Sequence, residues 1–317
     1  MDQNKTKNFD QVFYQILEEG YSSDSPYDHV VLFSGGKDST YIAHKMRQAK
    51  GGRVCLFTVD NGFEGNSYMD NLKKVASSLE MDLFIYVPPA DNLIKFYKFL
   101  ITEDLLKDFD SNPLCFFCAR YFMALGLEFA DRLHIPFVSY GATPTQLTGN
   151  KLARNLQDIE LFEPAARMMR ERIHRKISGL DIYQSDSVLK NTIDKIFYVP
   201  KRAKLMYPFQ YIEYNIQTMI NTLESEYGWE PPSKELTKEE YLTSGCELLD
   251  LVYTISNKRG FKMHEPEQIE DDYEHGLMEE KAYKFNKKLF GGMLDKSPSE
   301  QVTKNAKILG VDHLIDS

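Results

Sequence analysis

Six consecutive residues, 34–39 with the sequence SGGKDS, combine the side chains and the backbone freedom that a phosphate site requires. Two glycines, Gly35 and Gly36, let the backbone turn tightly, so that successive N–H groups can converge on one anion. Lys37 adds a mobile cation, the flanking serines add hydroxyl donors, and Asp38 could orient a magnesium ion or the lysine. This combination predicts a site for a polyphosphate.

The residues around this hexapeptide predict a strand before it and a helix after it. Residues 29–33 (HVVLF) are apolar, which is typical of a buried parallel strand, and residues 40–48 have helical spacing. The N-terminus of such a helix offers N–H groups without helical partners and the positive end of the helix dipole. The spacing differs from the common P-loop, which has four residues between its first glycine and its Gly-Lys pair. The alternative is an ordinary turn with a solvated Lys37–Asp38 pair.

Cysteines form a second group of residues that could do chemistry. Cys115 and Cys118 form a CxxC pair at the expected start of a helix, where a thiol has a lowered pKa and the thiolate is favoured. A CxxC pair alone is compatible with a redox pair, a metal site or chance. Cys246 is the remaining candidate for a third metal ligand, and a packed thiol is the alternative for it. Cys55 lies inside an apolar run and is expected in the core.

The composition excludes several classes of protein. The chain has 317 residues, 42% of them hydrophobic, and its 38 Lys and Arg against 47 Asp and Glu give a net charge of −9. This apolar content argues against disorder, and no apolar run reaches the roughly 20 residues of a membrane span. Four cysteines do not make a disulfide framework, so we expect a cytoplasmic protein. An acidic chain is a poor general binder of nucleic acid, although a tRNA substrate stays open.

Strands and helices are predicted to alternate through residues 28–155. Strands are expected at residues 29–33, 54–59, 83–87 and 136–140, and the helices between them at residues 40–48, 67–79, 91–107 and 115–133. This alternation predicts right-handed βαβ units and a doubly wound parallel α/β sheet. Ligands bind beyond the carboxyl ends of such strands, which here are residues 34–39, 60–63 and 141–146.

The remaining chain is predicted to be helical. Residues 1–27 form an N-terminal helical segment, and residues 156–317 form a helical C-terminal extension or domain. Its helices are expected at residues 161–177, 185–197, 214–227, 238–258 and 267–289. Residues 151–204 are locally basic, which most often means a solvated helix face. The sharper hypothesis is a lid over an anionic substrate, in which Lys201, Arg202 or Lys204 clamps phosphate.

The hexapeptide and its strand–helix setting resemble the PP-loop ATP pyrophosphatase family, whose motif is SGGxDS after the first strand. The resemblance covers residues 28 to about 145 and implies a PP-loop, HUP-like fold. These enzymes cleave ATP between the α and β phosphates and transfer AMP to a carbonyl oxygen, which a sulfur or nitrogen nucleophile then displaces. The resemblance implies ATP and Mg²⁺ as ligands and catalytic roles for Lys37 and Asp38. It also implies these ATP-binding residues: Ser34, Gly35, Gly36, Lys37, Asp38, Ser39, Phe57, Thr58, Val59, Asp60, Gly141, Ala142 and Thr143.

The cysteines resemble those of PP-loop sulfur-transfer enzymes such as tRNA 2-thiocytidine synthetases, in which three cysteines hold a 4Fe–4S cluster. The resemblance implies catalytic roles for Cys115 and Cys118 and a cluster or Zn²⁺ on Cys115, Cys118 and Cys246, with a persulfide on one cysteine as the alternative. The implied function is ATP-dependent sulfur transfer to a small molecule or nucleotide, as in 6-thioguanine formation. The sulfur would come from a donor protein or sulfide. A homodimer, common among relatives, stays open.

Residues 207–212 and 223–232 are similar to another PP-loop branch, the N-acetyl sugar amidotransferases. That likeness implies an alternative function, in which ammonia from a glutaminase partner is the nucleophile. The chain lacks the cysteine pair that we expect before the loop in that branch. A nucleotide-binding sensor without catalysis is the third hypothesis, and the intact SGGKDS motif argues against it.

Overall fold

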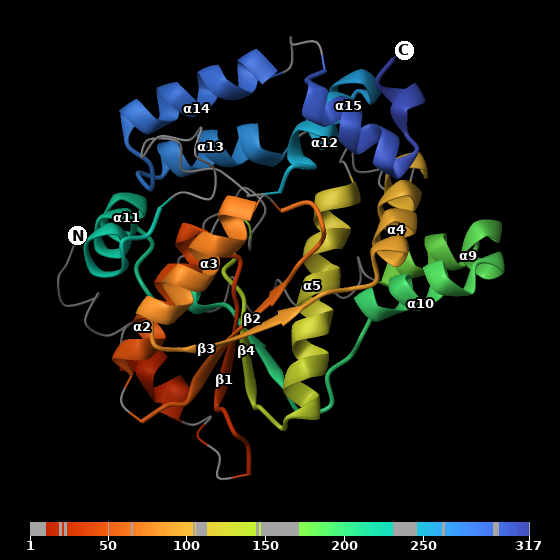
Figure 1. The fold of residues 1–317 in the computed structure, drawn as a ribbon. Coiled ribbons are helices and arrows are strands. Elements are labelled where there is room, and N and C mark those ends of the chain that lie inside the picture. Colours follow the sequence, from red (N-terminus) through yellow and green to blue (C-terminus); the bar gives the residue numbers. More distant parts are fainter. Residues whose placement is uncertain are drawn as a thin grey trace.

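The computed structural model describes residues 11–18, 21, 24–49, 51–64, 66–103, 105, 113–143, 146, 171–230, 246–261, 264–293 and 298–316. Its centre is a five-stranded sheet with the order β3-β2-β1-β4-β5, in which every pair of neighbours is parallel (Figure 1). The strands are β1 (His29–Leu32), β2 (Val54–Val59), β3 (Asp82–Tyr86), β4 (Phe137–Ser139) and β5 (Lys204–Met206). The predicted doubly wound parallel α/β sheet is therefore confirmed.

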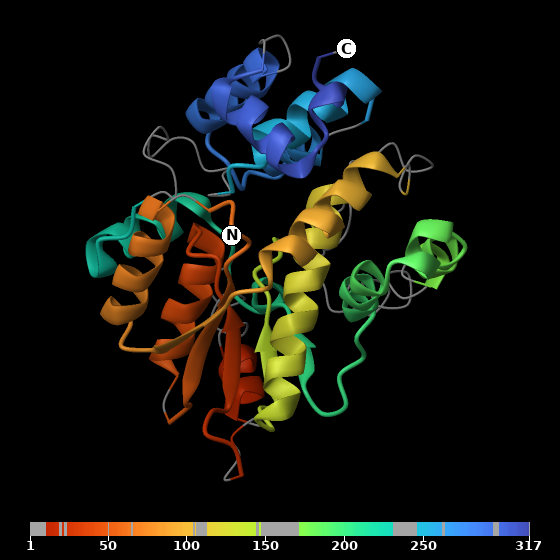
Figure 2. The ribbon, with the colours of Figure 1, turned by 45° about the vertical axis from the view of Figure 1, so that its right-hand side comes forward.

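Helices cover both faces of the sheet and one of its ends. They are α2 (Lys37–Gln48), α3 (Asn66–Ser78), α4 (Ala90–Thr102), α5 (Pro113–Arg132), α9 (Asp181–Ser185), α10 (Ser187–Ile196), α11 (Ile216–Tyr227), α12 (Leu249–Arg259), α13 (His264–Glu274), α14 (Glu280–Met293) and α15 (Glu300–Leu309), with 3-10 turns η2 (Pro208–Gln210) and η3 (Asp312–Leu314). Figure 2 shows α12–α15 as a layer above the sheet, at the end where the strands finish. No helix in the described ranges is long and apolar enough to cross a membrane.

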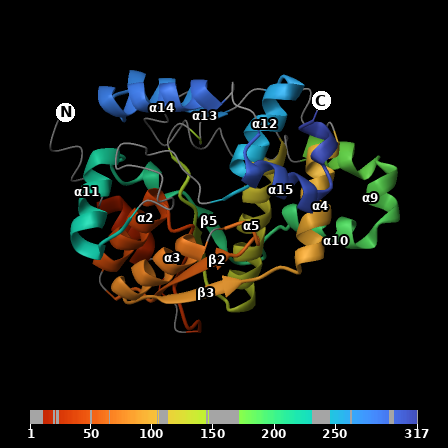
Figure 3. The same ribbon diagram turned by 45° about the horizontal axis from the view of Figure 1, so that its top comes forward.

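Alternating side chains on the strands build two separate apolar cores. Val30 packs with residues of α4, α5 and α10 on one face, and its neighbour Val31 packs with residues of α2, α3 and α11 on the other. Cys55 is fully buried in the first core, as predicted. Figure 3 shows α11 beside α2, on the same side of the sheet as α3. Both faces are thus covered, which explains why the central strands are apolar without alternation.

The C-terminal half differs from the prediction in one strand, one helix break and two helices, α9 and α15, that the sequence did not predict. The sequence predicts no strand after residue 150, yet β5 pairs with β4 and completes the sheet. Three residues are too short a run to give a strand signal in sequence. The single helix predicted at residues 267–289 is two helices, because the chain turns at Gly276 with φ +70°. The predicted helices at residues 185–197 and 214–227 are confirmed by α10 and α11.

Parts of the predicted organisation lie outside the described residues. This applies to the boundary at residues 155–156, to most of the helix predicted at residues 161–177 and to the first part of the helix predicted at residues 238–258. Residues 171–178 are helical, and α12 forms the end of the second predicted helix. In the N-terminal segment, residues 11–18 are helical and bury Phe13 and Leu17 in the second core.

Candidate active site

The turn between β1 and α2 has glycines at the two positions that lead into the helix. Gly35 has φ +68°, a left-handed conformation that glycine adopts without strain. Gly36 occupies the N-cap position of α2 and, as a glycine, has no side chain with which to cap the helix. The Ser34 N–H donates to Ser39 Oγ at 3.2 Å, and Ser39 Oγ donates to the Gly36 carbonyl at 3.3 Å, which closes the turn. An anion at this end of α2 would meet N–H groups and a positive dipole.

The charged pair in the turn is largely shielded from water. Lys37 Nζ lies 2.8 Å from Asp38 Oδ2, and the two side chains are only 11% and 24% exposed. The ammonium also lies 5.9 Å from the ring centroid of Tyr214. Burial, and then the Asp38 charge, raise the pKa of Tyr214 well above its usual value, so this hydroxyl stays protonated. The alternative of a solvated Lys37–Asp38 pair therefore does not describe this turn.

Asp38 also fits the magnesium ion that a polyphosphate would bring. Its Oδ1 atom is buried and has no hydrogen-bond partner among the described residues, while Oδ2 accepts from Lys37 Nζ. Carboxylate oxygens are the protein ligands that Mg²⁺ prefers, usually one or two of them together with phosphate oxygens and water. Asp38 would hold the ion through Oδ1.

The ends of β2 and β4 lie on either side of this turn, as the strand order requires. A Cβ atom on Gly141 would lie 3.4 Å from the Ser39 backbone nitrogen and 3.5 Å from Asp38 Cβ, so β4 delivers its end directly to the turn. The other residues predicted to bind ATP line the same edge: Phe57, Thr58, Val59, Ala142 and Thr143 are buried there, and Asp60 accepts a hydrogen bond from the Gly62 N–H at 2.9 Å. The three predicted segments are therefore brought together.

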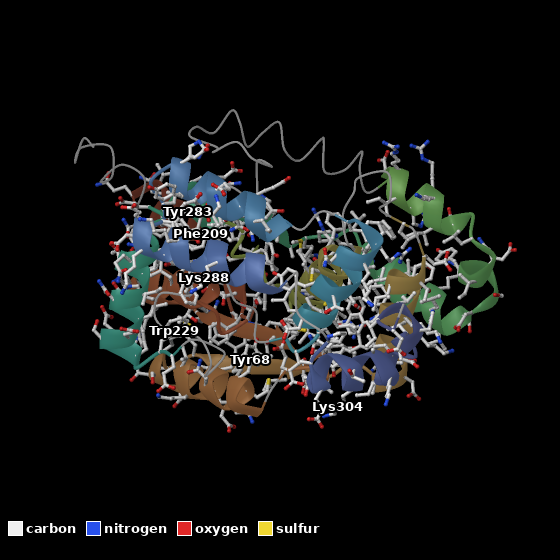
Figure 4. The ribbon with its side chains drawn as sticks, turned by 90° about the horizontal axis from the view of Figure 1, so that it is seen from above. Tyr68, Phe209, Trp229, Tyr283, Lys288 and Lys304 are labelled. Carbon is white, nitrogen blue, oxygen red and sulfur yellow. The ribbon has the colours of Figure 1, made fainter. Side chains whose placement is uncertain are left out.

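Two residues that the sequence did not single out contact the turn directly. Tyr68 of α3 donates its hydroxyl hydrogen bond to the Ser34 carbonyl, and Trp229 Nε1 donates to the Gly35 carbonyl at 2.9 Å. Figure 4, seen from above, labels both side chains. The sequence indicates Trp229 only through the likeness of its segment or as apolar packing, because nothing in its neighbours points to a contact 194 residues away in the chain.

The three cysteines of the predicted metal site come together near the end of β2. Residue Glu64 forms an antiparallel bridge with Cys246, and Asn61 Nδ2 donates to Cys246 Sγ at 3.5 Å. Cys118 Sγ lies 3.3 Å from the hydroxyl oxygen of Tyr97. An ionised thiol at Cys118 or at Cys115 would raise the pKa of Cys246 through its charge, so all three thiols lie in one region.

Burial governs the ionisation of this region and corrects one prediction. Burial raises the pKa of Cys118 to about 12. The hydrogen bond with Tyr97 lowers this pKa and the charge of Glu64 raises it, but burial has the largest effect. Burial and Glu64 likewise raise the pKa of Cys246 well above its usual value. The expected thiolate at Cys118 is therefore wrong, because a helix dipole acts within the first turn and Cys118 is the sixth residue of α5. Cys115, in that first turn, is exposed.

A metal ion or cluster does not fit these cysteines as they are arranged. All four cysteines of the chain are among the described residues, yet no group of three or more His, Cys, Asp or Glu side chains there could hold a metal ion. The predicted set of Cys115, Cys118 and Cys246 gathers in one region without forming a metal-binding geometry. Glu64, which the sequence analysis missed, adds a carboxyl whose pKa burial and Asp60 raise to about 7.

The predicted phosphate clamp lies at the amino-terminal ends of the strands, away from the turn at residues 34–39. Lys204 is the first residue of β5 and pairs with the first residue of β4, so Lys201, Arg202 and Lys204 lie where the strands begin. Asp131 holds this segment there, accepting from the backbone N–H groups of Lys201 at 2.6 Å and Arg202 at 2.9 Å. The turn at residues 34–39 follows the carboxyl end of β1, which is the opposite end of the parallel strands (Figure 2). These three cations therefore do not contact that turn.

Comparison with known proteins returns solved structures only, since no family model and no curated protein matches the chain. One match is the U34-tRNA thiolase NcsA of Methanococcus maripaludis with its 4Fe–4S cluster, at 16% identity and a TM-score of 0.40, covering 93% of this chain and 82% of that one. A second is the NMN synthetase of Francisella tularensis, at 11% identity and a TM-score of 0.43, covering 93% and 98%. A third is the NH3-dependent NAD synthetase of Campylobacter jejuni subsp. jejuni NCTC 11168 in complex with the nitrate ion, at 16% identity and a TM-score of 0.35, covering 64% and 100%.

At these identities and TM-scores the likeness is one of backbone course, and no ligand or residue role passes from these proteins to this chain.

Proposed function

We propose that this protein is an ATP-dependent adenylating enzyme of the PP-loop type that replaces a carbonyl oxygen of its substrate with sulfur. The observation that carries the adenylating part is the turn at residues 34–39. It joins a left-handed glycine, an uncapped helix N-terminus and a shielded Lys37–Asp38 pair. These features together suit the leaving pyrophosphate of ATP, whose developing charge needs preorganised donors.

Each part of the turn has a role in the proposed first step. The substrate's carbonyl oxygen attacks the α-phosphorus, the bond from that phosphorus to the bridging oxygen breaks, and pyrophosphate departs. The N–H groups at the start of α2 and the Lys37 ammonium hold the departing charge. Magnesium, held by Asp38, supplies further neutralisation when bound. Val59, the last residue of β2, and Gly141, two residues after the end of β4, flank the nucleotide.

Cys115 is the thiol that we assign to the second step. It is exposed in the first turn of α5, whereas burial keeps Cys118 and Cys246 protonated. A donor protein would transfer sulfur to Cys115 as a persulfide. The outer persulfide sulfur would attack the activated carbon, and AMP would leave with the former carbonyl oxygen. Two equivalents of a thiol reductant would then cleave the S–S bond, releasing first the thio product and then the free Cys115 thiol. A free purine nucleotide is the proposed acceptor, since the net charge of −9 does not favour a tRNA.

The raised thiol pKa values support a second candidate, amide or amidine formation with ammonia. Two of the three thiols near the site are poor nucleophiles at neutral pH, because only the thiolate attacks well. An ammonia nucleophile would need none of them. In this alternative the first step and the roles of Lys37 and Asp38 are unchanged.

Nucleotide binding tests the shared first step. Calorimetric titration with MgATP should give a measurable affinity that Lys37→Met lowers by about 10-fold or more, since a charge-assisted contact contributes about 1.5–3 kcal/mol. Lys45→Met, on the same helix α2, is the matched control and should bind as the wild type does. A wild type without affinity for ATP would overturn the proposal, as would equal affinity in both variants.

The nucleophile is tested with GMP as the acceptor and either a persulfide donor with a thiol reductant or ammonium in the assay. Sulfur transfer predicts a thio product in mass spectrometry, which is lost in Cys115→Ser while MgATP binding and the pyrophosphate release of the first step persist. A nitrogen product, formed equally well by Cys115→Ser, would instead establish amidation. Full thio-product turnover in Cys115→Ser would remove this cysteine from the mechanism.

A further inference from the structure

Two successive peptide groups of the turn, which join Ser34 to Gly35 and Gly35 to Gly36, are both held by side chains from distant segments. The Ser34 carbonyl accepts from the Tyr68 hydroxyl, and the Gly35 carbonyl accepts from Trp229 Nε1 at 2.9 Å. Both Tyr68 and Trp229 are buried. Neither contact belongs to the hydrogen bonds that close the turn itself.

A trans peptide group has its C=O and N–H pointing in opposite directions. Fixing the Ser34 carbonyl on Tyr68 therefore directs the Gly35 N–H away from α3. Fixing the Gly35 carbonyl on Trp229 directs the Gly36 N–H away from Trp229 in the same manner. With φ +68° at Gly35 the two planes are oriented independently of a regular strand or helix, so they need an external support.

We propose that Tyr68 and Trp229 are positioning residues, which fix two successive peptide planes so that the Gly35 and Gly36 N–H groups face a bound phosphate. The inference rests on the proposed function, because it takes this turn to be the phosphate site. It assigns the segment after α11, in the C-terminal half, a direct part in shaping the turn after β1.

Helix α3 fixes the positions of both Tyr68 and Trp229. Asn71 Nδ2 donates to the Glu230 carbonyl at 3.0 Å, and Lys74 Nζ donates to the Gly228 carbonyl at 3.1 Å, so α3 grips the backbone on either side of Trp229. The same helix supplies Tyr68 itself. Gly228, with φ +57°, ends α11 and turns the chain so that the indole returns to the loop.

The test removes each hydrogen bond while keeping an aromatic side chain, with Tyr68→Phe and Trp229→Phe. The matched control is Tyr227→Phe, which removes a 2.8 Å hydrogen bond from α11 to His44 Nδ1 of α2 without touching the turn. Affinities are measured by calorimetry with three probes: MgATP, inorganic pyrophosphate and adenosine. Adenosine has no phosphate, so it reports on the rest of the site.

Each positioning variant should bind MgATP and pyrophosphate about 5–10-fold more weakly, as expected for one hydrogen bond, and the double variant more weakly still. Adenosine affinity should stay at the wild-type level, and Tyr227→Phe should match the wild type with all probes. Trp229 is the single tryptophan of the chain, so pyrophosphate should also change the intrinsic fluorescence of the wild type.

Two outcomes would overturn the positioning role. Wild-type pyrophosphate affinity in both variants would show that the planes need no support, and equal losses for adenosine and pyrophosphate would show a merely structural effect. A wild type that binds neither MgATP nor pyrophosphate would instead overturn the proposed function, so the two failures are distinguishable.

Discussion

Replacing Gly35 with alanine tests the backbone geometry on which the proposed function depends. Gly35 has φ +68°, and this left-handed conformation costs a residue with a Cβ atom about 1–2 kcal/mol. The new Cβ atom itself has room, because its nearest neighbour, Leu72, would lie 3.5 Å away. The penalty is therefore one of backbone conformation alone.

The size of the effect follows from the length of the chain. An unfolding entropy of about 2.1 cal/mol/K per residue gives about 0.67 kcal/mol/K for 317 residues, so Gly35→Ala should lower Tm by about 1.5–3 °C. Any relaxation of φ turns the neighbouring N–H groups away from the phosphate. Since a hydrogen bond to a charged group contributes about 1.5–3 kcal/mol, MgATP affinity should fall about 10–100-fold.

Gly260→Ala is the control for this experiment. Gly260 also has φ +68° and lies at the end of α12, and a Cβ atom added there would have no neighbour within 4 Å. It should lose the same stability while binding MgATP as the wild type does. Thermal unfolding and calorimetric titration measure the two quantities. A Gly35→Ala protein with wild-type affinity would refute the assignment of this turn to phosphate, and one with wild-type Tm would refute its left-handed geometry.

Three further predictions concern thiol reactivity, pH dependence and stability. Iodoacetamide at mildly alkaline pH should alkylate Cys115 well before Cys118, because burial raises the pKa of the Cys118 thiol to about 12; peptide mass spectrometry gives the order. Burial raises the pKa of Asp131, but its hydrogen bonds from Tyr198 and three backbone N–H groups outweigh this and lower the pKa to about 2. Asp131→Asn should therefore lower Tm at neutral pH, with a gap from the wild type that narrows as the pH falls from about 5 to about 2. Asp28→Asn should cost about 1.5–3 kcal/mol in denaturant unfolding, because this buried carboxylate accepts three hydrogen bonds from Arg53.

Each of these predictions has a clear contrary result. Equal labelling rates at the two cysteines of the CxxC pair would contradict the burial of Cys118. A gap in Tm that does not change with pH would show that Asp131 does not act through its charge. The sign follows from the lowered pKa: the ionised form is favoured in the folded state, so its stabilisation is present above the unfolded pKa and is lost in acid. Wild-type stability of Asp28→Asn would show that water replaces the Arg53 contacts.

Local patterns in the sequence were enough to predict four of the five strands and the turn after the first strand. The apolar run at residues 29–33, the glycine pair and the helical spacing after it act over a few residues, and the structure has a strand, a left-handed glycine and a helix there. The alternation of strands and helices also fixed which segments meet, because parallel strands bring their carboxyl ends to one edge. The closeness of Gly141 to Ser39 follows from that rule alone.

Long-range contacts decided the rest of the site. The sequence analysis placed Lys201 near the phosphate. The parallel pairing of the three-residue strand β5 with β4 puts Lys201 at the amino-terminal ends of the strands instead. The sequence also predicted a thiolate at Cys118, but burial, which depends on segments far along the chain, outweighs the local helix field.

What the sequence by itself determined about this protein is the type of the elements through β4 and the chemistry of one turn, because propensity, period and glycine conformation are properties of neighbouring residues. Only the tertiary structure decided which side chains support that turn. The contact of Trp229 with Gly35 spans 194 residues, and the bridge of Cys246 to Glu64 joins the two halves of the chain in the same way. Such contacts form because buried carbonyl and N–H groups must find partners wherever packing brings them, and no local pattern records that choice.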